Sequence, residues 1–334
     1  MKIAIVGAGA IGGLLGVRLA LSGEDVTFIA RGPNLAAIKA HGMRLIMEDK
    51  SELHAKGLRA CQTMQEAGPQ DVVLLTVKAH GVGPIAADIG ALCHEGTSIV
   101  TMQNGIPWWY FYHHGGALAG THIESADPGG LIAKAIDPAR VIGSVVYPAA
   151  NLVRPGVVEH LEGMRFSLGE PSGETTPRMQ GVAQALIKAG FRAPATNDIR
   201  SEIWLKIWGN SSFNPISALT HATLVDICQF PETRALAGTM MAEAEAIATK
   251  LDVKMKVGIE RRIAGAEKIG AHKTSMLQDI EQGRPIELEA LVGTVLELGR
   301  LTAVPTPAIA AVYACAKLLA KTLDAAKSPL RVGG

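Results

Sequence analysis

Short apolar segments alternate with helical segments through about the first 146 residues. In the intervals between the apolar runs, as at 11–22, the residues fit helical spacing. Four apolar runs are interpreted as strands, at 2–6, 25–30, 71–77 and 97–102. Strand and helix alternating at this spacing predict a doubly wound parallel sheet, which binds ligands at the carboxyl ends of its strands.

The pattern changes between about 141 and 168, where strand-like runs are broken by Gly and Pro. The runs 156–161 and 164–168 are separated by Glu162-Gly163 and predict an antiparallel hairpin added to the sheet edge. A helix over 180–188 and a last strand over 191–194 are expected to follow.

Strand-like patterns almost disappear from about residue 198. Helical spacing is found instead in four segments, at 234–250, 257–269, 287–301 and 307–321. The fold class predicted is α/β, with an N-terminal Rossmann-type doubly wound sheet and a C-terminal all-helical domain. We expect the first domain over 1–196, the helical domain for substrate binding or dimerisation over 197–326, and a frayed tail over 327–334.

The turn after the first strand has the spacing G-x-G-x-x-G. In this motif Gly7 makes the tight turn, Gly9 lets the backbone approach a pyrophosphate, and Gly12 lets the helix pack closely on the strand. The motif alone is weak, but here a strand precedes it and a helix follows. We therefore expect a dinucleotide to bind at Gly7, Gly9, Ala10, Ile11 and Gly12.

Arg31 directly follows the second strand, about twenty residues past the glycines. NAD-selective units place Asp or Glu there, which binds the ribose hydroxyls and repels a 2′-phosphate. A cation without a neighbouring acid favours NADP over NAD. The alternative is that Arg31 is an ordinary solvated loop charge.

Composition excludes several classes of protein. The 334 residues contain 32 Lys and Arg against 31 Asp and Glu with no basic block, so neither nucleic acid nor an anionic membrane is an expected partner. No apolar run reaches about eighteen residues, so no transmembrane segment is predicted. The four cysteines lack C-x-x-C spacing and nearby histidine pairs, which predicts free thiols in the cytoplasm and no metal site.

A polar stripe is predicted in the segment 202–215. Lys206, Asn210 and Asn214 recur every four residues, so on a helix they share one face, and Pro215 is expected to stop or kink that helix. An outward-facing wet surface is the alternative interpretation. Such surfaces are usually built from better helix formers than Asn, Gly and Ser, so a hydrogen-bonding wall is equally consistent with the pattern.

Five stretches together resemble the ketopantoate reductase (2-dehydropantoate 2-reductase) family over nearly the whole chain. They are GAGAIG at 7–12, TVKA with Lys78, QNG with Asn104, KIWGNSSFNP at 206–215, and TSMLQDIEQGRPIELEAL at 274–291. The resemblance implies an NADPH-dependent oxidoreductase that reduces a small 2-oxo acid, with 2-dehydropantoate in pantothenate biosynthesis as the first substrate to test.

The same resemblance implies roles for single residues. Lys206 corresponds to the general acid. Arg31 and Lys78 correspond to residues at the 2′-phosphate end of the cofactor, and Asn104 to one beside nicotinamide and substrate. The remaining implied substrate-binding residues are Asn210, Asn214, Ser275 and Glu287. For Glu287, a solvated acid in the first turn of a helix is the plain alternative.

One departure from the family bears on substrate choice. Residues 108–112 are five consecutive aromatics in a chain that is 4% aromatic, and we expect a packing element or a cleft wall there. Reduction of a different 2-oxo acid, a dehydrogenase for a 3-hydroxy acid or an opine, and a catalytically silent NADPH sensor stay open. A monomer and a homodimer are both compatible with the sequence.

Overall fold

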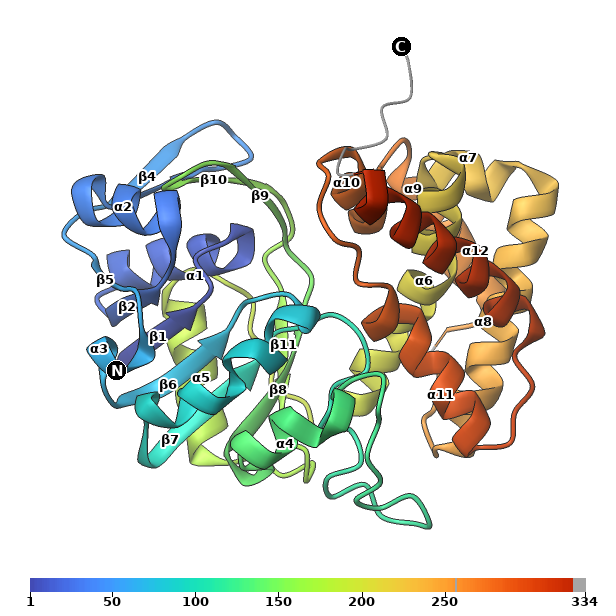
Figure 1. Ribbon diagram of the computed structural model, residues 1–334, viewed down its shortest axis with the longest axis horizontal. Helices are drawn as coiled ribbons and strands as arrows, with labels where there is room; N and C mark the ends of the chain where they lie inside the picture. Colours follow the sequence, from blue (N-terminus) through green and yellow to red (C-terminus); the bar gives the residue numbers. More distant parts are fainter. Residues whose placement is uncertain (256, 327–334) are drawn as a thin grey trace. The chain divides into compact units, whose positions relative to one another are not determined.

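The computed structural model describes residues 1–255 and 257–326, and its contacts divide the chain into two compact units (Figure 1). Unit 1 comprises residues 1–103, 107–122 and 127–199. Unit 2 comprises residues 104–106, 123–126 and the chain from 200 onward. The division after Ile199 falls three residues later than the boundary expected at 196, and two short segments inside the first span belong to unit 2. The tail expected to fray, 327–334, lies outside the described residues.

Unit 1 is built on a seven-stranded sheet with the order β11-β8-β7-β6-β1-β2-β5. Every neighbouring pair is parallel except β11 with β8. The doubly wound α/β class is therefore confirmed. The strands are β1 (Lys2–Val6), β2 (Asp25–Ile29), β5 (Arg59–Cys61), β6 (Gln70–Leu75), β7 (Cys93–Thr101), β8 (Val141–Val146) and β11 (Phe166–Gly169).

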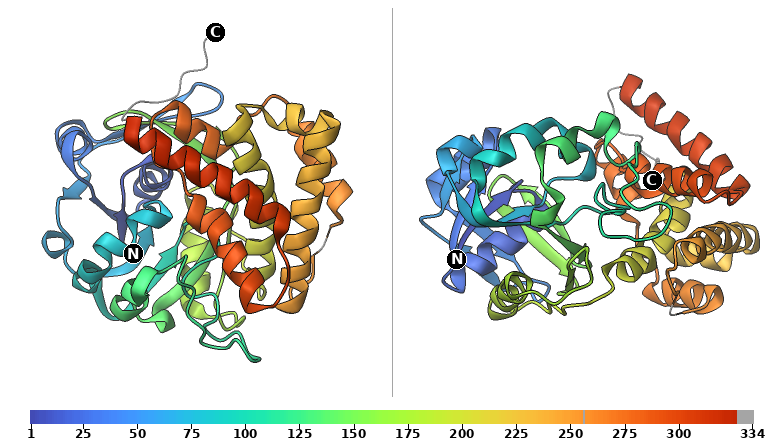
Figure 2. Two further views of the ribbon diagram at one scale, coloured as in Figure 1. Left: turned by 45° about the vertical axis from the view of Figure 1, so that its right-hand side comes forward. Right: turned by 90° about the horizontal axis from the view of Figure 1, so that it is seen from below.

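Helices cover both faces of this sheet. In the right-hand view of Figure 2, α5 (Pro177–Lys188) lies on one side of the strands and the 3₁₀ segment η2 (Gly83–Leu92) on the other. The other helical elements of unit 1 are α1 (Ala10–Leu21), α2 (Gly32–His41), α3 (Met64–Ala67), α4 (Leu131–Ala135), η1 (Ala79–Gly81), η3 (Pro128–Gly130) and η4 (Pro138–Arg140).

A second sheet of four strands, β4-β3-β10-β9, was not anticipated from the sequence. It comprises β3 (Met43–Ile46), β4 (Glu52–Ala55), β9 (Ala149–Arg154) and β10 (Val157–Glu162). The expected hairpin of 156–161 with 164–168 is wrong, because β10 pairs with β9 and β3 whereas β11 pairs with β8 in the main sheet. Gly163, at φ +77°, lies between β10 and β11, where the chain passes from one sheet to the other.

The expected last strand at 191–194 is also not a strand. Arg192 and Ala195 make only isolated parallel bridges, to Arg165 and Leu168. The two bridges are separated and form no continuous ladder, so this segment is an extended connection that runs parallel to β11 and exchanges backbone hydrogen bonds with it, as from the N–H of Phe166 to the carbonyl of Arg192 at 2.8 Å.

Helix α1 packs closely between the two sheets because it has glycine at the two positions, Gly13 and Gly16, where a side chain would clash. A Cβ on Gly16 would overlap the ring of Phe28 in β2, and a Cβ on Gly13 would lie 2.5 Å from Val158 in β10 and 2.8 Å from Met43 in β3. Both faces of α1 are therefore buried, and its mostly apolar sequence follows from that.

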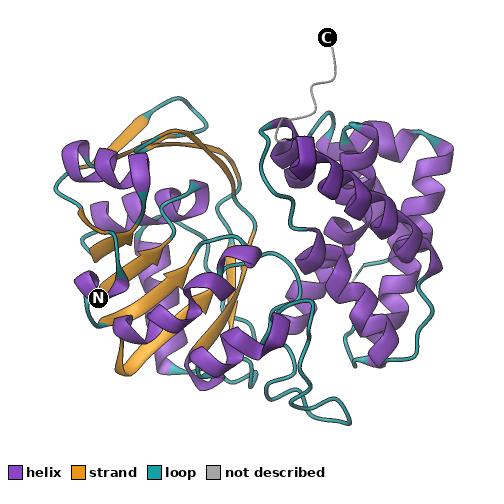
Figure 3. Cartoon of the chain, viewed as in Figure 1, coloured by secondary structure: helices purple, strands orange, loops and turns teal. Residues whose placement is uncertain are grey.

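Among the described residues of unit 2 the regular secondary structure is all helical, with helices in purple joined by loops in teal in Figure 3. The predicted all-helical class of this region is confirmed. Its elements are α6 (Ile199–Thr220), α7 (Leu224–Gln229), α8 (Pro231–Lys250), α9 (Ile259–Ile269), α10 (Ser275–Glu281), the π turn η5 (Glu289–Gly293), α11 (Thr294–Leu301) and α12 (Pro307–Ala326).

Pro215 does not end α6, which continues to Thr220. A proline inside a helix costs about 3 kcal/mol. Its neighbours Phe213 and Ile216 are each 2% exposed, and the burial of such side chains offsets a cost of this size. Among the helices of the described ranges, none has both the length and the hydropathy of a bilayer-spanning segment.

Candidate functional site

The glycine-rich loop after β1 has the close backbone packing that its three glycines predict. Gly7 adopts φ +107°, and a Cβ there would lie 2.7 Å from the side chain of Val77. A Cβ on Gly12 would overlap the carbonyl oxygen of Gly7, so only glycine lets α1 approach β1 this closely. A Cβ on Gly9 would meet nothing within 4 Å, which leaves this point of the backbone open to a ligand.

Strand β1 lies between β2 and β6, so the segments after these three parallel strands share one edge of the sheet. Arg31, the N-cap residue of α2, is exposed. Lys78, the N-cap residue of η1, follows β6 and is partly buried. The predicted cofactor residues of unit 1 therefore belong to neighbouring segments of this edge.

Gln103 also contacts this edge; the sequence placed it in the QNG motif but assigned it no role. Its side-chain amide donates to the carbonyls of Leu75 at 2.8 Å and Val77 at 3.0 Å. These bonds fix the backbone immediately before Lys78. Glutamine at a strand end has no sequence signature that separates this role from a solvated surface position.

In unit 2, α6 places Lys206, Asn210 and Asn214 on three successive turns. Lys206 and Asn210 are partly buried and Asn214 is 5% exposed, so this stripe is not an ordinary solvated face. The helix is anchored by two fully buried indoles, of which Trp208 donates from Nε1 to the carbonyl of Met241 in α8 at 2.7 Å. This anchorage holds the polar stripe in a fixed orientation.

The stripe meets a second predicted residue at the start of α10. Asn214 Nδ2 lies 3.4 Å from Ser275 Oγ, within hydrogen-bond distance. Ser275 is the first residue of α10, whose N-cap residue Thr274 accepts a hydrogen bond from the backbone N–H of Leu277. Two residues 61 positions apart in sequence are therefore brought together by the packing of unit 2.

Lys206 and Glu287 interact electrostatically. Burial is the main influence on the ammonium of Lys206 and lowers its pKa from the usual 10.5 to about 8, while the carboxylate of Glu287 acts in the opposite direction. The Lys206 residue as a whole is partly buried. A lysine with such a pKa is a competent proton donor near neutral pH.

The π turn η5 holds the segment that carries Asn104. The carbonyl of Ala290 accepts hydrogen bonds from the backbone N–H of Ile106 at 3.3 Å and from the hydroxyl of Thr294 at 2.8 Å. Gly105 adopts φ +102°, and a Cβ on it would overlap the same carbonyl. This contact joins the segment of Asn104 to the turn that follows Glu287, and both residues belong to unit 2.

The aromatic run is a packing element for three of its five residues. Trp109, Tyr110 and Phe111 are at most 2% exposed, and Trp109 donates from Nε1 to Thr101 Oγ1 at 2.9 Å. The rings of Tyr110 and Phe111 meet edge to face at 5.1 Å. This confirms the packing interpretation for residues 109–111.

Two family models together match most of the chain. A family model described as "Ketopantoate reductase PanE/ApbA" matches residues 3–173, and one described as "Ketopantoate reductase PanE/ApbA C terminal" matches residues 198–320. The chain belongs to the ketopantoate reductase family. A relative from Mesorhizobium japonicum, named 2-dehydropantoate 2-reductase, is 55% identical over 321 residues, covering 96% of this chain and 98% of the relative.

Solved structures agree with this assignment. A structure from Ralstonia solanacearum MolK2, provisionally described as a ketopantoate reductase, is 40% identical with a TM-score of 0.92, covering 97% of this chain and 98% of the other. A D-mandelate dehydrogenase, solved with NADH and anilino(oxo)acetate, is 23% identical and shares the fold, with a TM-score of 0.82 over 97% of this chain and 100% of its own. As a member of the ketopantoate reductase family, the chain is an oxidoreductase.

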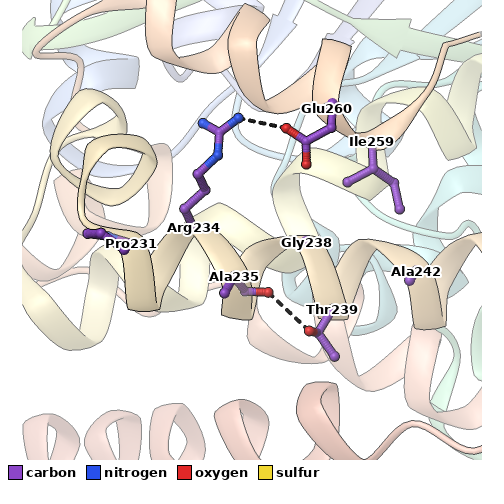
Figure 4. Close-up of a pocket in the computed structure, with 8 residues that line it drawn as sticks. All are labelled: Pro231, Arg234, Ala235, Gly238, Thr239, Ala242, Ile259 and Glu260. Carbon is purple, nitrogen blue, oxygen red and sulfur yellow. Dashed lines mark hydrogen bonds and ion pairs between the residues drawn. The ribbon is translucent and has the colours of Figure 1, made fainter.

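Unit 2 also contains an open pocket of about 590 Å³, which lies between α8 and α9 (Figure 4). Arg234 and Glu260 form an ion pair at 2.7 Å across it. None of the predicted site residues lines this pocket, so we do not connect it with the candidate site.

We predict that Gly105→Ala destabilises the protein by about 1–3 kcal/mol, because an L-residue is strained at φ +102° and its Cβ would displace the Ala290 carbonyl. Gly265→Ala in α9, where a Cβ meets nothing within 4 Å, should be neutral or stabilising by up to about 1 kcal/mol. Urea denaturation of both variants measures the difference. Equal free energies of unfolding for the two would contradict the proposed docking of this segment on η5.

Proposed function

We propose that this member of the ketopantoate reductase family uses NADPH to reduce 2-dehydropantoate to pantoate, a step of pantothenate biosynthesis. The observation that carries the proposal is the lowered pKa of Lys206 beside Glu287, on the helix that also presents Asn210 and Asn214. The 55% identical relative named 2-dehydropantoate 2-reductase supports the substrate.

The cofactor would be held by unit 1. The loop from Gly7 to Gly12 fits the pyrophosphate, and Arg31 supplies a cation where NAD-selective units carry an acid. Lys78 follows the neighbouring strand and provides a second cation for the 2′-phosphate. NADPH, when bound, supplies a hydride to the carbonyl carbon of the substrate.

Lys206 would act on the substrate oxygen. Hydride addition to a ketone leaves negative charge on this oxygen, and a nearby ammonium stabilises that charge and then donates a proton from Nζ. The lowered pKa favours this donation, because a proton is released more readily from an ammonium of pKa about 8 than from one at the usual 10.5.

The remaining residues would orient the substrate without adding cationic charge. The amides of Asn104, Asn210 and Asn214 offer both donors and acceptors for the substrate carboxylate and for Lys206. Ser275, within hydrogen-bond distance of Asn214, extends the same polar wall. Glu287 would accept a hydrogen bond from the substrate hydroxyl remote from the reacting carbon. Its charge would also limit how far burial lowers the pKa of Lys206, so that the lysine stays protonated near neutral pH.

The first test is NADPH oxidation against a panel of 2-oxo acids that includes 2-dehydropantoate. The wild-type protein should prefer 2-dehydropantoate, and Lys206→Ala should lower kcat about 10²–10⁴-fold, the usual contribution of a general acid. NADPH affinity, measured by fluorescence titration, should change little. A Lys206→Ala variant with near-normal kcat, or a wild-type protein that turns over no 2-oxo acid, would refute the proposal.

The pH dependence of kcat should report Lys206. Because Lys206 donates its proton only in the ammonium form, kcat for reduction should fall as the pH rises through about 8. Glu287→Gln removes the charge that raises this pKa, so the fall should move to lower pH. Glu260→Gln, at the pocket between α8 and α9, serves as the control and should leave the profile in place. An unchanged pH profile in Glu287→Gln would show that Glu287 does not influence the pKa of Lys206.

Cofactor choice should depend on Arg31. Arg31→Ala should weaken NADPH about ten- to a hundredfold and leave NADH nearly unchanged, because one charge-assisted contact to the 2′-phosphate is lost. Lys39→Ala, which removes an exposed cation from the last turn of the same helix, is the matched control. The ratio of the two dissociation constants is the measurement, and an unaltered ratio would make Arg31 a surface charge only.

A further inference from the structure

The glycine-rich loop is held by side chains to which the proposed function assigns no role. Thr76 follows β6, and its hydroxyl lies 2.7 Å from the carbonyl oxygen of Gly7 and 3.0 Å from that of Val6. Asn34, in the first turn of α2, donates from Nδ2 to the carbonyl of Ala8. Two side chains from two different elements thus bind successive carbonyls of the loop.

A third carbonyl of the loop is occupied by α1 itself. The backbone N–H of Gly13 donates to the carbonyl of Gly9 at 2.8 Å. The carbonyls of Gly7, Ala8 and Gly9 therefore all accept hydrogen bonds from fixed donors. Three successive peptide planes in this loop have their orientation set by the protein alone.

Fixing a carbonyl also fixes the next N–H. The peptide group is planar and trans, so the C=O of one residue and the N–H of the following residue point in opposite directions. Holding the carbonyls of Gly7, Ala8 and Gly9 therefore turns the N–H groups of Ala8, Gly9 and Ala10 away from those donors. These amides lie at the start of α1, where N–H groups lack intrahelical acceptors and favour an anion.

Asn34 and Thr76 are themselves held in place by further hydrogen bonds. Asn34 Oδ1 accepts from the backbone N–H of Gly156, between β9 and β10, at 2.7 Å. Because Ala8 offers an acceptor and Gly156 a donor, only one orientation of the Asn34 amide satisfies both. The backbone N–H of Thr76 donates to Val6 at 3.0 Å, which fixes Thr76 against the end of β1.

We propose that Thr76 and Asn34 are positioning residues that orient the amides of Ala8, Gly9 and Ala10 toward the pyrophosphate of the cofactor. This inference rests on the proposed binding of NADPH and specifies how the protein prepares the site. Both residues act through the loop, so their effect falls on the pyrophosphate that NADPH and NADH share. It is independent of the 2′-phosphate and of the proton donor Lys206.

The Thr76 pair of variants tests the hydroxyl. Thr76→Val has nearly the same shape but cannot donate, so the dissociation constants of NADPH and NADH should both rise about 5- to 20-fold, the size expected for one hydrogen bond. Thr76→Ser keeps the hydroxyl and should bind within about twofold of wild type. Thr239→Val in α8 removes a hydroxyl that donates to the Ala235 carbonyl at 3.0 Å, and as a control should change neither constant.

Asn34→Leu tests the second bond. It should weaken NADPH and NADH by a similar factor and keep the ratio of their dissociation constants, unlike Arg31→Ala, which changes that ratio. At saturating NADPH, kcat should stay near the wild-type value, because the proton donor is untouched. The second readout is the rise in melting temperature when NADPH is added, which should be smaller for Asn34→Leu than for wild type.

The outcomes separate this inference from the proposed function. If wild type binds NADPH and Thr76→Val binds it equally well, the positioning role is refuted and the proposed function stands. A selective loss of NADPH in either variant, or a fall in kcat with unchanged binding, also refutes the role. If wild type binds neither NADPH nor NADH, the proposed function itself fails. Should Asn34→Leu fail to fold, the Thr76 variants still decide the question.

Discussion

The close approach of α1 to β1 is the constraint on which the architecture of unit 1 depends. A Cβ on Gly12 would overlap the carbonyl of Gly7. Gly13 and Gly16 likewise leave room for the second sheet and for the ring of Phe28, respectively. Only this spacing allows the start of α1 to face the loop after β1. The carbonyls of that loop are then within reach of Thr76 and Asn34, which come from separate elements.

In unit 2 the state of Lys206 depends on a different balance, between the desolvation of its ammonium and the charge of Glu287. The buried indoles of Trp204 and Trp208 fix α6, so the turn that carries Lys206 cannot rotate into solvent. Burial lowers the pKa of Lys206, and Glu287 limits how far it falls. A lysine that is charged yet ready to release its proton needs both influences, because full desolvation would leave it neutral and full solvation would leave it a weak acid.

Gly105 and the π turn η5 together join the segment of Asn104 to the part of unit 2 that carries Glu287. The π turn begins two residues after Glu287, and its Ala290 carbonyl accepts hydrogen bonds from both Ile106 and Thr294. Such insertions disturb the regular hydrogen-bonding pattern and are frequent at functional sites. Here the disturbed carbonyl becomes the anchor for a segment from another part of the chain.

The sequence by itself determined what depends on local spacing. The glycine motif, the alternation of strand and helix, and the helical second unit follow from side-chain size and periodicity over neighbouring residues, and the structure confirms that fold class. The sequence also placed Lys206, Asn210 and Asn214 on one helix face, because four-residue spacing sets that face directly.

Only the tertiary structure decided the pairings between distant segments. The strands 157–162 and 166–169 look like a hairpin in sequence, yet they lie in two sheets, where β10 pairs with β9 and β3 and β11 pairs with β8. The π turn, the buried partner of Trp208 and the lowered pKa of Lys206 have no local signature. The hydrogen bonds of Asn34 and Thr76 to the loop have none either, since each joins residues at least 26 positions apart. Contacts of that kind arise from packing and desolvation, which depend on where the whole chain folds rather than on the order of neighbouring residues.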